Sequence, residues 1–479
     1  MQFNWDQYPI EKNFDETISS PSHARAPSRK LLTFLNGLTD DDIKDRLEAR
    51  DTAIKTIGIS FTVYSESGNI DREWPLDIIP RIISSKEWHR VEQGLIQRLT
   101  ALNLFINDIY NNKKIFKDKL IPLDIILSSP GYRKECEGVS LPFNTWAHIC
   151  GTDLIRDDKG KFLVLEDNLR IPSGVSYMLE NRRVTKRVLP ELFESYDVKH
   201  LGEYPNHLLE MLSSIAPKKK KEPEIVVLTP GIYNSAYFEH SYLAQQMGAE
   251  LVEGSDLVVD NDIVYMKTVA GLRKVDVIYR RVDDLYLDPD VFDEKSLLGV
   301  RGLMKAWRKG NVSIANAPGA GVADDKVIYT FVPKLIKYYL DEDPILENVE
   351  SYLCSDPEHY EFIRNNLHNL VIKPANESGG YGMLIGPQAS SKEISKFKKL
   401  IKKYGRNYIA QPLISLSTCP VTTPFGAKPR HIDLRPFILQ SKNSYVTAGG
   451  LTRVAMKKGS YVVNSSQGGG SKDTWVIDS

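Results

Sequence analysis

From residue 224 onward, strand-like apolar segments alternate with a helical segment, and this alternation limits the possible folds more than any other feature of the chain. EIVVLTPG is typical of a strand, SAYFEHSYLAQQMG of a helix, and AELVEG and VDVIYRRVDD of two further strands. Strands that are joined through a helix run parallel within one sheet. We therefore expect a small parallel α/β unit over residues 224–318.

The 479 residues suffice for more than one hydrophobic core. Ser84 and Ser85 are cap candidates for a long helix whose apolar residues recur at helical spacing. The run APKKKKEPE suits an anion-binding patch, but flanking prolines favour a solvated linker. We expect a mainly helical region over 1–143, two strands and a helical stretch over 144–215, the linker over 216–223, the α/β unit, and mixed α+β lobes over 319–479.

The composition is that of a globular enzyme in a reducing compartment. Lysine plus arginine and aspartate plus glutamate both number 62, so no net charge draws the chain to nucleic acid. The N-terminus lacks the apolar core of a signal peptide, and no apolar run is long enough to span a membrane. The cysteines are scattered, away from any metal-ligand spacing: Cys136, Cys150, Cys354 and Cys419. We expect a cytoplasmic protein that binds neither membrane nor nucleic acid.

The segment VLEDNLRIPSG ends an apolar strand in charged and amide residues. Strand side chains alternate, so Glu166 and Asn168 share one face and Asp167 takes the other. If a two-residue turn joins this strand to the preceding one, Asp153 lies on the face of Glu166; a three-residue loop would place it on the opposite face. Such oxygen ligands suit Mg²⁺. A polar hairpin end that faces water is an equally open interpretation.

The segment LVIKPANESGGYGMLIG combines a lysine with a glycine-rich loop. Lys373 supplies positive charge, and Gly379, Gly380 and Gly382 allow backbone N–H groups to approach phosphate oxygens. A flexible hairpin explains the same residues equally well. Lys326 is a second candidate phosphate ligand, although a lone lysine is more often a solvated surface residue.

Two later strands carry further candidates. YIAQPLI, with Gln411 and Leu413, can present backbone groups to an adenine edge or be an ordinary strand end. RHIDLRPFIL places Asp433 and Arg435 on one strand face, either as a buried ion pair or as a phosphate-binding arginine with its orienting carboxylate. Arg453 lies in another apolar strand. The glycines at 468–470 indicate either a loop over the site or a mobile tail.

Together these segments resemble the circularly permuted ATP-grasp type 2 family over about residues 60 to 476. The resemblance rests on VLEDNLRIPSGVSYMLENRR, LTPGIYNSAYFEH, VDVIYRRVDD, ANAPGAGVADDK, PRHIDLRPF and VVNSSQGGGSKDTW, which occur in this order. In other ATP-grasp proteins the magnesium segment comes last, whereas here it precedes the α/β unit. The ligase half of glutathionylspermidine synthetase is a more distant relative with a permuted grasp.

The resemblance implies an α/β fold of α+β lobes that bind nucleotide, with a small parallel pre-ATP-grasp unit and an N-terminal helical region. It implies ATP-dependent ligation of a carboxylate to an amine through an acyl phosphate, with an amino acid or short peptide as substrate. A kinase or ATPase, or a nucleotide-binding pseudoenzyme scaffold, is the alternative. Relatives are often encoded beside a helical partner and a transglutaminase-like protein, which are therefore possible partners.

The resemblance also assigns residues. Asp153, Glu166 and Asn168 would hold Mg²⁺, and the ATP ligands would be Lys326, Lys373, Gly379, Gly380, Gly382, Gln411 and Leu413. Gln411 stands where glutamate is usual. Gly151 stands where many relatives carry a phosphate-binding arginine, and the candidates to replace it are Arg170, Arg435 and Arg453. Ser173 and Ser176 either contact the acid or cap the following helix.

Overall fold

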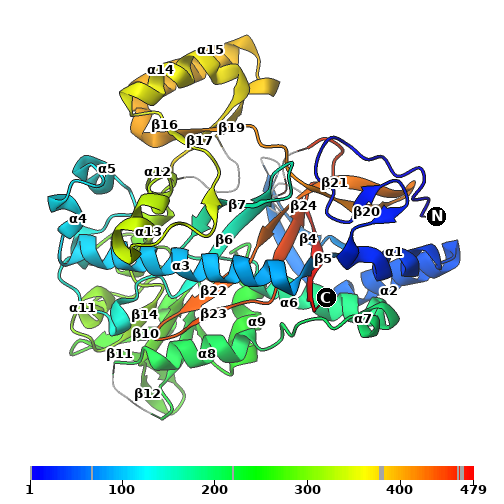
Figure 1. Cartoon of the computed structure of the whole chain (residues 1–479). Helices are drawn as coiled ribbons and strands as arrows, with labels where there is room; N and C mark the ends of the chain where they lie inside the picture. Colours follow the sequence, from blue (N-terminus) through cyan, green and yellow to red (C-terminus); the bar gives the residue numbers. More distant parts are fainter. Residues whose placement is uncertain are drawn as a thin grey trace.

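The computed structural model describes residues 3–65, 68–217, 221–376, 382–460, 463 and 469–478. A ten-stranded sheet at its centre draws strands from both ends of the chain (Figure 1). The main path follows the order β15 (Glu347–Asn348), β7 (Phe162–Asn168), β6 (Ile149–Arg156), β21 (Gly426–Arg435), β24 (Leu451–Val454), β25 (Gly470–Ile477) and β5 (Leu76–Ser84). β20 (Thr418–Thr423) pairs with β21, and β22 (Phe437–Gln440) pairs with β6 and β23 (Ser444–Val446).

Two helices cover the opposite faces of this sheet. α3 (Ser85–Tyr110) begins after Ser84, whose side chain accepts a hydrogen bond from the backbone N–H of Glu87, as the sequence predicts. Ile83 of β5 belongs to the core that includes α3, whereas its neighbour Ile82 belongs to the core that includes α6 (Val175–Val188). Successive strand side chains point to opposite faces, so the sheet lies between these helices.

The expected parallel α/β unit is confirmed. Its sheet has the order β14 (Ser313–Ala315), β13 (Val277–Arg280), β8 (Ile225–Leu228) and β9 (Glu250–Val252), and every pairing is parallel. α9 (Tyr237–Met247) connects β8 to β9. An antiparallel sheet that the sequence pattern did not predict is added by β10 (Leu257–Asp260), β11 (Ile263–Thr268) and β12 (Gly271–Lys274).

A small lobe stands above the main body in Figure 1 and has its own core. Its antiparallel sheet has the order β16 (Tyr352–Leu353), β19 (Tyr408–Pro412), β17 (Leu370–Pro374) and β18 (Leu384–Ile385). Two helices pack on it, α14 (Pro357–Asn366) and α15 (Ser391–Tyr404). The lobe thus brings Lys373 and Gln411 onto paired neighbouring strands.

The remaining elements surround these sheets. The helices are α1 (Arg29–Asn36), α2 (Asp40–Ile57), α4 (Lys114–Lys117), α5 (Leu123–Leu127), α7 (Pro190–Ser195), α8 (Tyr204–Ser214), α10 (Asp284–Leu287), α11 (Leu303–Arg308), α12 (Lys326–Tyr329) and α13 (Val332–Leu340). The strands are β1 (Ile18–Ser20), β2 (His23–Ala24), β3 (Ser60–Ser65) and β4 (Gly68–Glu73). None of the helices in the described ranges is long and apolar enough to cross a membrane.

The N-terminal region over 1–143 combines helices with strands, whereas the sequence pattern favoured helices there. β5 joins the main sheet parallel to β25, which lies near the other end of the chain. Because its partner is so distant in sequence, no local pattern reveals the pairing. The linker expected over 216–223 lies between α8 and β8, and residues 218–220 fall outside the described residues.

Candidate active site

The β6–β7 hairpin carries the predicted metal ligands on one face, but it does so in an unexpected way. Near the turn, Arg156 pairs with Phe162, a register that would place Asp153 and Glu166 on opposite faces. A β-bulge between Asp153 and Leu154 shifts the register, so that Asp153 pairs with Glu166. The turn is therefore not the two-residue alternative, and the bulge nevertheless places Asp153 on the face of Glu166.

Asp167 occupies the opposite face, as alternation predicts. Its carboxylate accepts hydrogen bonds from Nε of Arg98 at 2.9 and 2.8 Å, and Arg98 comes from α3. Both side chains are almost fully buried. The ion pair therefore ties the strand that ends at the site to the helix that covers the sheet.

The Asp153 carboxylate accepts hydrogen bonds from two guanidinium groups. Arg435 donates from Nε to Oδ1 at 2.5 Å and from a terminal nitrogen to Oδ2 at 2.8 Å, and Arg453 donates to Oδ2 at 2.7 Å. Arg453 also donates a hydrogen bond from Nε to Oδ1 of Asp433 at 2.9 Å. Burial opposes ionisation of Asp153, but the two arginines outweigh it and hold the pKa of that carboxyl well below its usual range.

Glu166 is the point at which several cations meet. Nζ of Lys326 lies 3.1 Å from its Oε2, and a terminal nitrogen of Arg435 lies 4.0 Å from its Oε1. Lys373 also interacts electrostatically with this carboxylate. Burial lowers the pKa of Lys373 to about 8, and Lys326 acts in the same direction, while the charges of Glu166 and Asp153 oppose the shift. With Arg453 and Asp433, these residues form a dense, partly buried cluster of four cations and three carboxylates, which is typical of functional sites.

The two lysines come from adjoining segments. The backbone N–H of Lys326 donates to the carbonyl of Ala375 at 2.9 Å, just beyond the end of β17, which carries Lys373. Asp325 caps α12, and Arg406 donates to its Oδ2 at 2.7 Å. These contacts join the small lobe to the segment that holds Lys326, so both lysines approach Glu166 at the border of lobe and main sheet.

Glu166 and Asn168 fit a magnesium ion better than Asp153 does. The Glu166 side chain is 20% exposed, and Asn168 donates its amide hydrogen to the carbonyl of Gly151 at 3.0 Å, which leaves its oxygen on the other side of the amide. Both oxygens of Asp153, whose side chain is 2% exposed, already accept from arginines. Within the described ranges no group of three or more His, Cys, Asp or Glu side chains could hold a metal ion. Mg²⁺ needs few protein ligands, so this carboxylate–amide pair is a sufficient donor set.

Arg435 fills the space next to Gly151. A Cβ atom at residue 151 would lie 3.2 Å from Cδ and 3.4 Å from Cγ of Arg435, and 3.3 Å from Cβ of Pro172. The glycine therefore makes room for the stem of this arginine. Of the three arginines considered as substitutes for the family arginine at this position, Arg435 alone lies against it among the described contacts.

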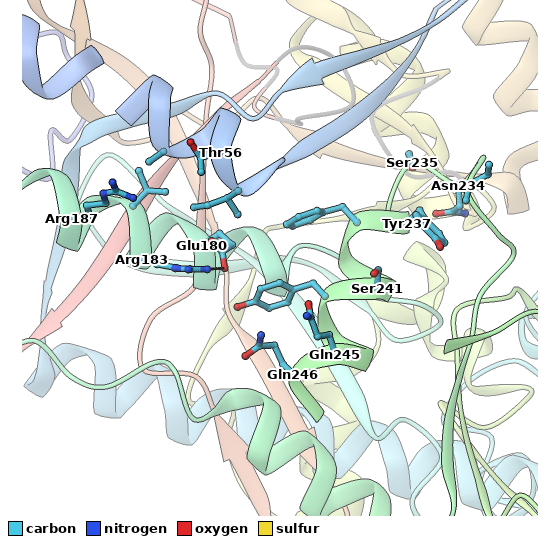
Figure 2. A pocket seen from close by; sticks show the side chains of 16 residues that line it. Thr56, Glu180, Arg183, Arg187, Asn234, Ser235, Tyr237, Ser241, Gln245 and Gln246 are labelled. Atoms are coloured by element: carbon cyan, nitrogen blue, oxygen red, sulfur yellow. Dashed lines mark hydrogen bonds and ion pairs between the residues drawn. The ribbon is translucent and has the colours of Figure 1, made fainter. Parts of the chain in front are cut away.

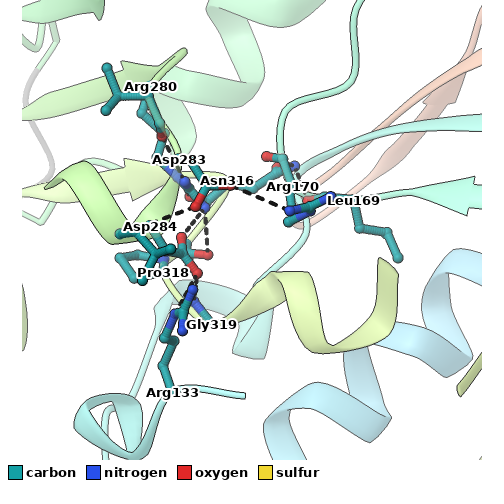
Figure 3. Close-up of polar contacts among 12 residues, drawn as sticks. Arg133, Leu169, Arg170, Arg280, Asp283, Asp284, Asn316, Pro318 and Gly319 are labelled. Atoms are coloured by element: carbon teal, nitrogen blue, oxygen red, sulfur yellow. Dashed lines mark hydrogen bonds and ion pairs between the residues drawn. The ribbon is translucent and has the colours of Figure 1, made fainter. Parts of the chain in front are cut away.

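Arg170 points away from this cluster toward two other carboxylates. Its Nε donates to Oδ2 of Asp324 at 2.6 Å, and a terminal nitrogen lies 3.5 Å from Asp283 (Figure 3). Asn316 lies beside it and donates to the carbonyls of Leu169 and Ile149 at 2.6 and 2.7 Å. These contacts hold the end of β7 and the start of β6 in place.

The segment between β7 and α6 is held by the parallel unit. Glu239 of α9 accepts from the backbone N–H groups of Gly174 and Ser176 at 2.8 and 3.1 Å and from the Ser176 hydroxyl at 3.1 Å. Arg281 donates to the Ser173 hydroxyl at 2.7 Å and to Glu239 at 3.0 Å. Both serines therefore bond within the protein, but neither caps α6, because its N-cap residue is Gly174, without a side-chain cap hydrogen bond.

Several predicted nucleotide ligands are placed less directly. Gly379, Gly380 and Gly468 lie outside the described residues. Gly382 is described and has a φ of 68°. Gln411 is buried and donates to the Ser351 hydroxyl at 2.9 Å, while Leu413 follows the end of β19 and is half-buried. The roles of these residues remain predictions.

Sequence reasoning missed the side chains that orient the site. Asp324 accepts from the backbone N–H of Leu169 at 2.6 Å, in addition to Arg170. Asp324, Glu239 and Arg281 each lie inside a segment that carries the family resemblance. The signal was therefore present in the segments, but the partners come from distant parts of the chain.

A small antiparallel lobe and a large sheet meet where two lysines lie near the Glu166 carboxylate, and this architecture is that of an ATP-grasp protein. The chain belongs to the circularly permuted ATP-grasp type 2 family, whose sequence model matches residues 80–455. ATP-grasp proteins generally use ATP and Mg²⁺, and a ligase family of this kind acts on small molecules.

Relatives extend over nearly the whole chain. An uncharacterized protein of Synechocystis sp. is 52% identical over 465 residues, which are 97% of both chains. A putative glutamate–cysteine ligase of Frankia alni is 40% identical over 97% of this chain, which corresponds to 54% of that protein. The solved structure of a glutathione synthetase-like effector from Globodera pallida has a TM-score of 0.60 and 13% identity, and it covers 92% of this chain and 98% of that one. This structural likeness supports the fold.

Proposed function

We propose that the protein is an ATP-dependent carboxylate–amine ligase that acts through an acyl phosphate on an amino acid or short peptide. The observation that carries the proposal is the meeting of Lys326, Lys373 and Arg435 at Glu166. With the ion-paired Asp153, Arg453 and Asp433 included, four cations face three carboxylates, and the remaining positive charge suits nucleotide phosphates. The family membership and the name of the Frankia relative favour ligation over other uses of ATP.

Each side chain of the cluster has a proposed task. Lys326 and Lys373 bind the β- and γ-phosphates, and Arg435 binds the phosphoryl group in transfer, from beside Gly151. Asp153 positions Arg435 and Arg453 through the ion pairs described above. Magnesium, when bound by Glu166 and Asn168, would neutralise phosphate charge.

The proposed reaction has two steps. An oxygen of the substrate carboxylate attacks the γ-phosphorus, the bond from that phosphorus to the β,γ-bridging oxygen breaks, and ADP leaves. The amine nitrogen then attacks the acyl carbon and loses a proton, and inorganic phosphate leaves with the former carboxylate oxygen. Both steps build negative charge on oxygen, which the arginines stabilise. No nucleophilic side chain is required.

Product analysis separates the ligase from the alternatives. The full chain is incubated with Mg·ATP and pairs of amino acids, and ADP, phosphate and organic products are measured. A ligase forms ADP and amide together only when acid and amine are both present. Phosphorylated acid that accumulates without amine would instead establish a kinase, ADP formation independent of both would establish an ATPase, and nucleotide binding without turnover would establish a scaffold.

The matched control is the Glu166→Gln variant. Glutamine has the same size and shape as glutamate, but it removes the negative charge that the three cations face. Amide formation that continued at an unchanged rate in this variant would place the active site elsewhere. The helical partner and the transglutaminase-like protein remain proposals, to be tested by adding each to the same assay.

A further inference from the structure

A cavity of about 660 Å³ lies away from the charge cluster, between α2, α6 and α9 (Figure 2). Its volume falls in the range of small-molecule sites in proteins. The wall from α2 includes Thr56, the wall from α6 includes Glu180, and the wall from α9 includes Tyr242. The loop before α9 adds Asn234 and Ser235, so polar groups converge on the cavity from several elements.

Glu180 is the most informative residue of this cavity. Its side chain is 1% exposed, and its buried Oε2 has no hydrogen-bond partner among the described residues. Its Oε1 lies 3.5 Å from a terminal nitrogen of Arg183 (Figure 2). A buried carboxylate oxygen without a donor is costly, and a ligand that brings a positively charged donor would remove that cost.

Two positively charged side chains also line the cavity. Arg183 and Arg187 are one helical turn apart on α6, and both line the cavity. Arg183 is 69% exposed, and Arg187 is exposed and forms no ion pair within the described part of the chain. Two guanidinium groups above a buried carboxylate suit a ligand that has an ammonium at one end and a carboxylate at the other.

Aromatic rings also line the cavity. Phe238 and Tyr242 both belong to the lining, and their ring centroids are 5.9 Å apart. Burial, and then the charge of Glu180 and a hydrogen bond to that carboxylate, raises the pKa of Tyr242, which keeps this hydroxyl protonated as a donor to Glu180. Aromatic rings with one polar end suit the short apolar body of an amino acid or peptide.

We infer that this cavity binds a free amino acid or short peptide, with its ammonium group on Glu180 and its carboxylate on Arg183 and Arg187. Because the cavity lies away from the charge cluster, this ligand is not the carboxylate that attacks ATP, and its binding does not rest on the proposed function.

Two of the three helices that line the cavity also contact the segment beside the active site. α6 begins at Val175, after its N-cap residue Gly174, and the backbone N–H of Gly174 donates to Glu239 of α9 at 2.8 Å. Glu239 is the direct neighbour of Phe238. Glu180 lies about 9 Å along α6 from this contact, at the usual rise per residue. A ligand in the cavity therefore contacts both helices that hold the segment after Asn168.

Binding is tested on the full chain by thermal shift and calorimetry with each proteinogenic amino acid and its dipeptides with glycine. We expect at least one of them to bind, and its N-acetyl and C-terminal amide forms to bind about tenfold more weakly or worse. Glu180→Gln and Arg187→Gln should each weaken binding by about tenfold. Arg187 is exposed, so its replacement leaves the core intact. Lys44→Gln, on α2 but outside the cavity lining and 71% exposed, is the control and should bind normally.

Absence of binding across both panels would overturn the inference, as would equal affinity in the wild type, Glu180→Gln and Arg187→Gln. The same titrations are repeated in the Glu166→Gln variant and with a non-hydrolysable ATP analogue. Ligand binding that persists there, without any amide formed by the wild type, would refute the proposed function and leave the site. Amide formation by the wild type, in the absence of any ligand binding that depends on Glu180 or Arg187, would refute the cavity site and leave the proposed function.

Discussion

Arg435 lies so close to Gly151 that a Cβ atom on residue 151 would come within 3.2 Å of its Cδ. Arg435 in turn holds Asp153 and approaches Glu166. We expect Gly151→Ala to displace this guanidinium by a few tenths of an ångström. ATP turnover should fall about tenfold or more, because positioning errors of this kind are costly in catalysis. The free energy of unfolding, measured in urea, should fall by no more than about 1–3 kcal/mol.

Gly202→Ala is the matched control for this change. A Cβ atom on residue 202 would meet nothing within 4 Å, so the same substitution there adds no contact. Equal turnover in the two variants would show that Arg435 does not depend on the space at Gly151.

Glu166→Gln should change the binding of ATP in two opposite directions. Lys326 and Arg435 lose the carboxylate that they face, so ATP without Mg²⁺ should bind more tightly. Mg²⁺ should no longer strengthen binding, and turnover should fall about 100-fold or more. Calorimetry with and without Mg²⁺ gives both results. A variant whose affinity still rises with Mg²⁺ would remove Glu166 from the donor set.

Arg453→Met should destabilise the fold strongly. This arginine lies between Asp433 and Asp153, and its loss leaves Asp433 buried without its main partner. Breaking one side of a buried ion pair costs about 3–5 kcal/mol, which urea unfolding measures directly. Arg430→Met, in the neighbouring strand β21, is the control, because Arg430 is only half-buried and bonds to backbone carbonyls. Equal losses in both variants would argue against a network centred on Arg453.

His148 should make the protein sensitive to mild acid. Burial lowers the pKa of this imidazole from 6.5 to about 3, so between these values the unfolded chain binds more protons than the folded one. The free energy of unfolding should therefore fall as the pH falls below 6.5, by about 2 kcal/mol between pH 6.5 and 5. His148→Leu should lack this part of the loss. His89→Leu, at a side chain that is 67% exposed, should retain it, and a similar pH profile for both variants would contradict the assignment.

Local sequence patterns predicted the parts of the site that depend on local geometry. Alternation placed Asp167 opposite Glu166, and the apolar segments after residue 224 defined the parallel sheet. The bulge at Asp153 was not predicted, because an extra residue can be inserted at many positions of either strand. No particular residue type in the sequence marks the position. The shared face of Asp153 and Glu166 therefore arises from the bulge and not from a two-residue turn.

Contacts between distant segments could not be predicted in the same way. Arg435 reaches Asp153 across 282 residues of sequence, and Arg281 reaches Ser173 across 108. Such pairings follow from the order of strands in the sheet and from the packing of α9 against α6. The ten-stranded sheet itself joins β5 to β25, so its topology is a property of the whole chain.

The most direct test of the proposed ligase follows one oxygen atom. The acid substrate is labelled with ¹⁸O in its carboxylate and incubated with the full chain, Mg·ATP and the amine, and the phosphate that forms is analysed by mass spectrometry. An acyl phosphate requires that one labelled oxygen move from the acid to each phosphate, in step with amide formation. Amide formed together with unlabelled phosphate, or phosphate released without amide, would contradict the account.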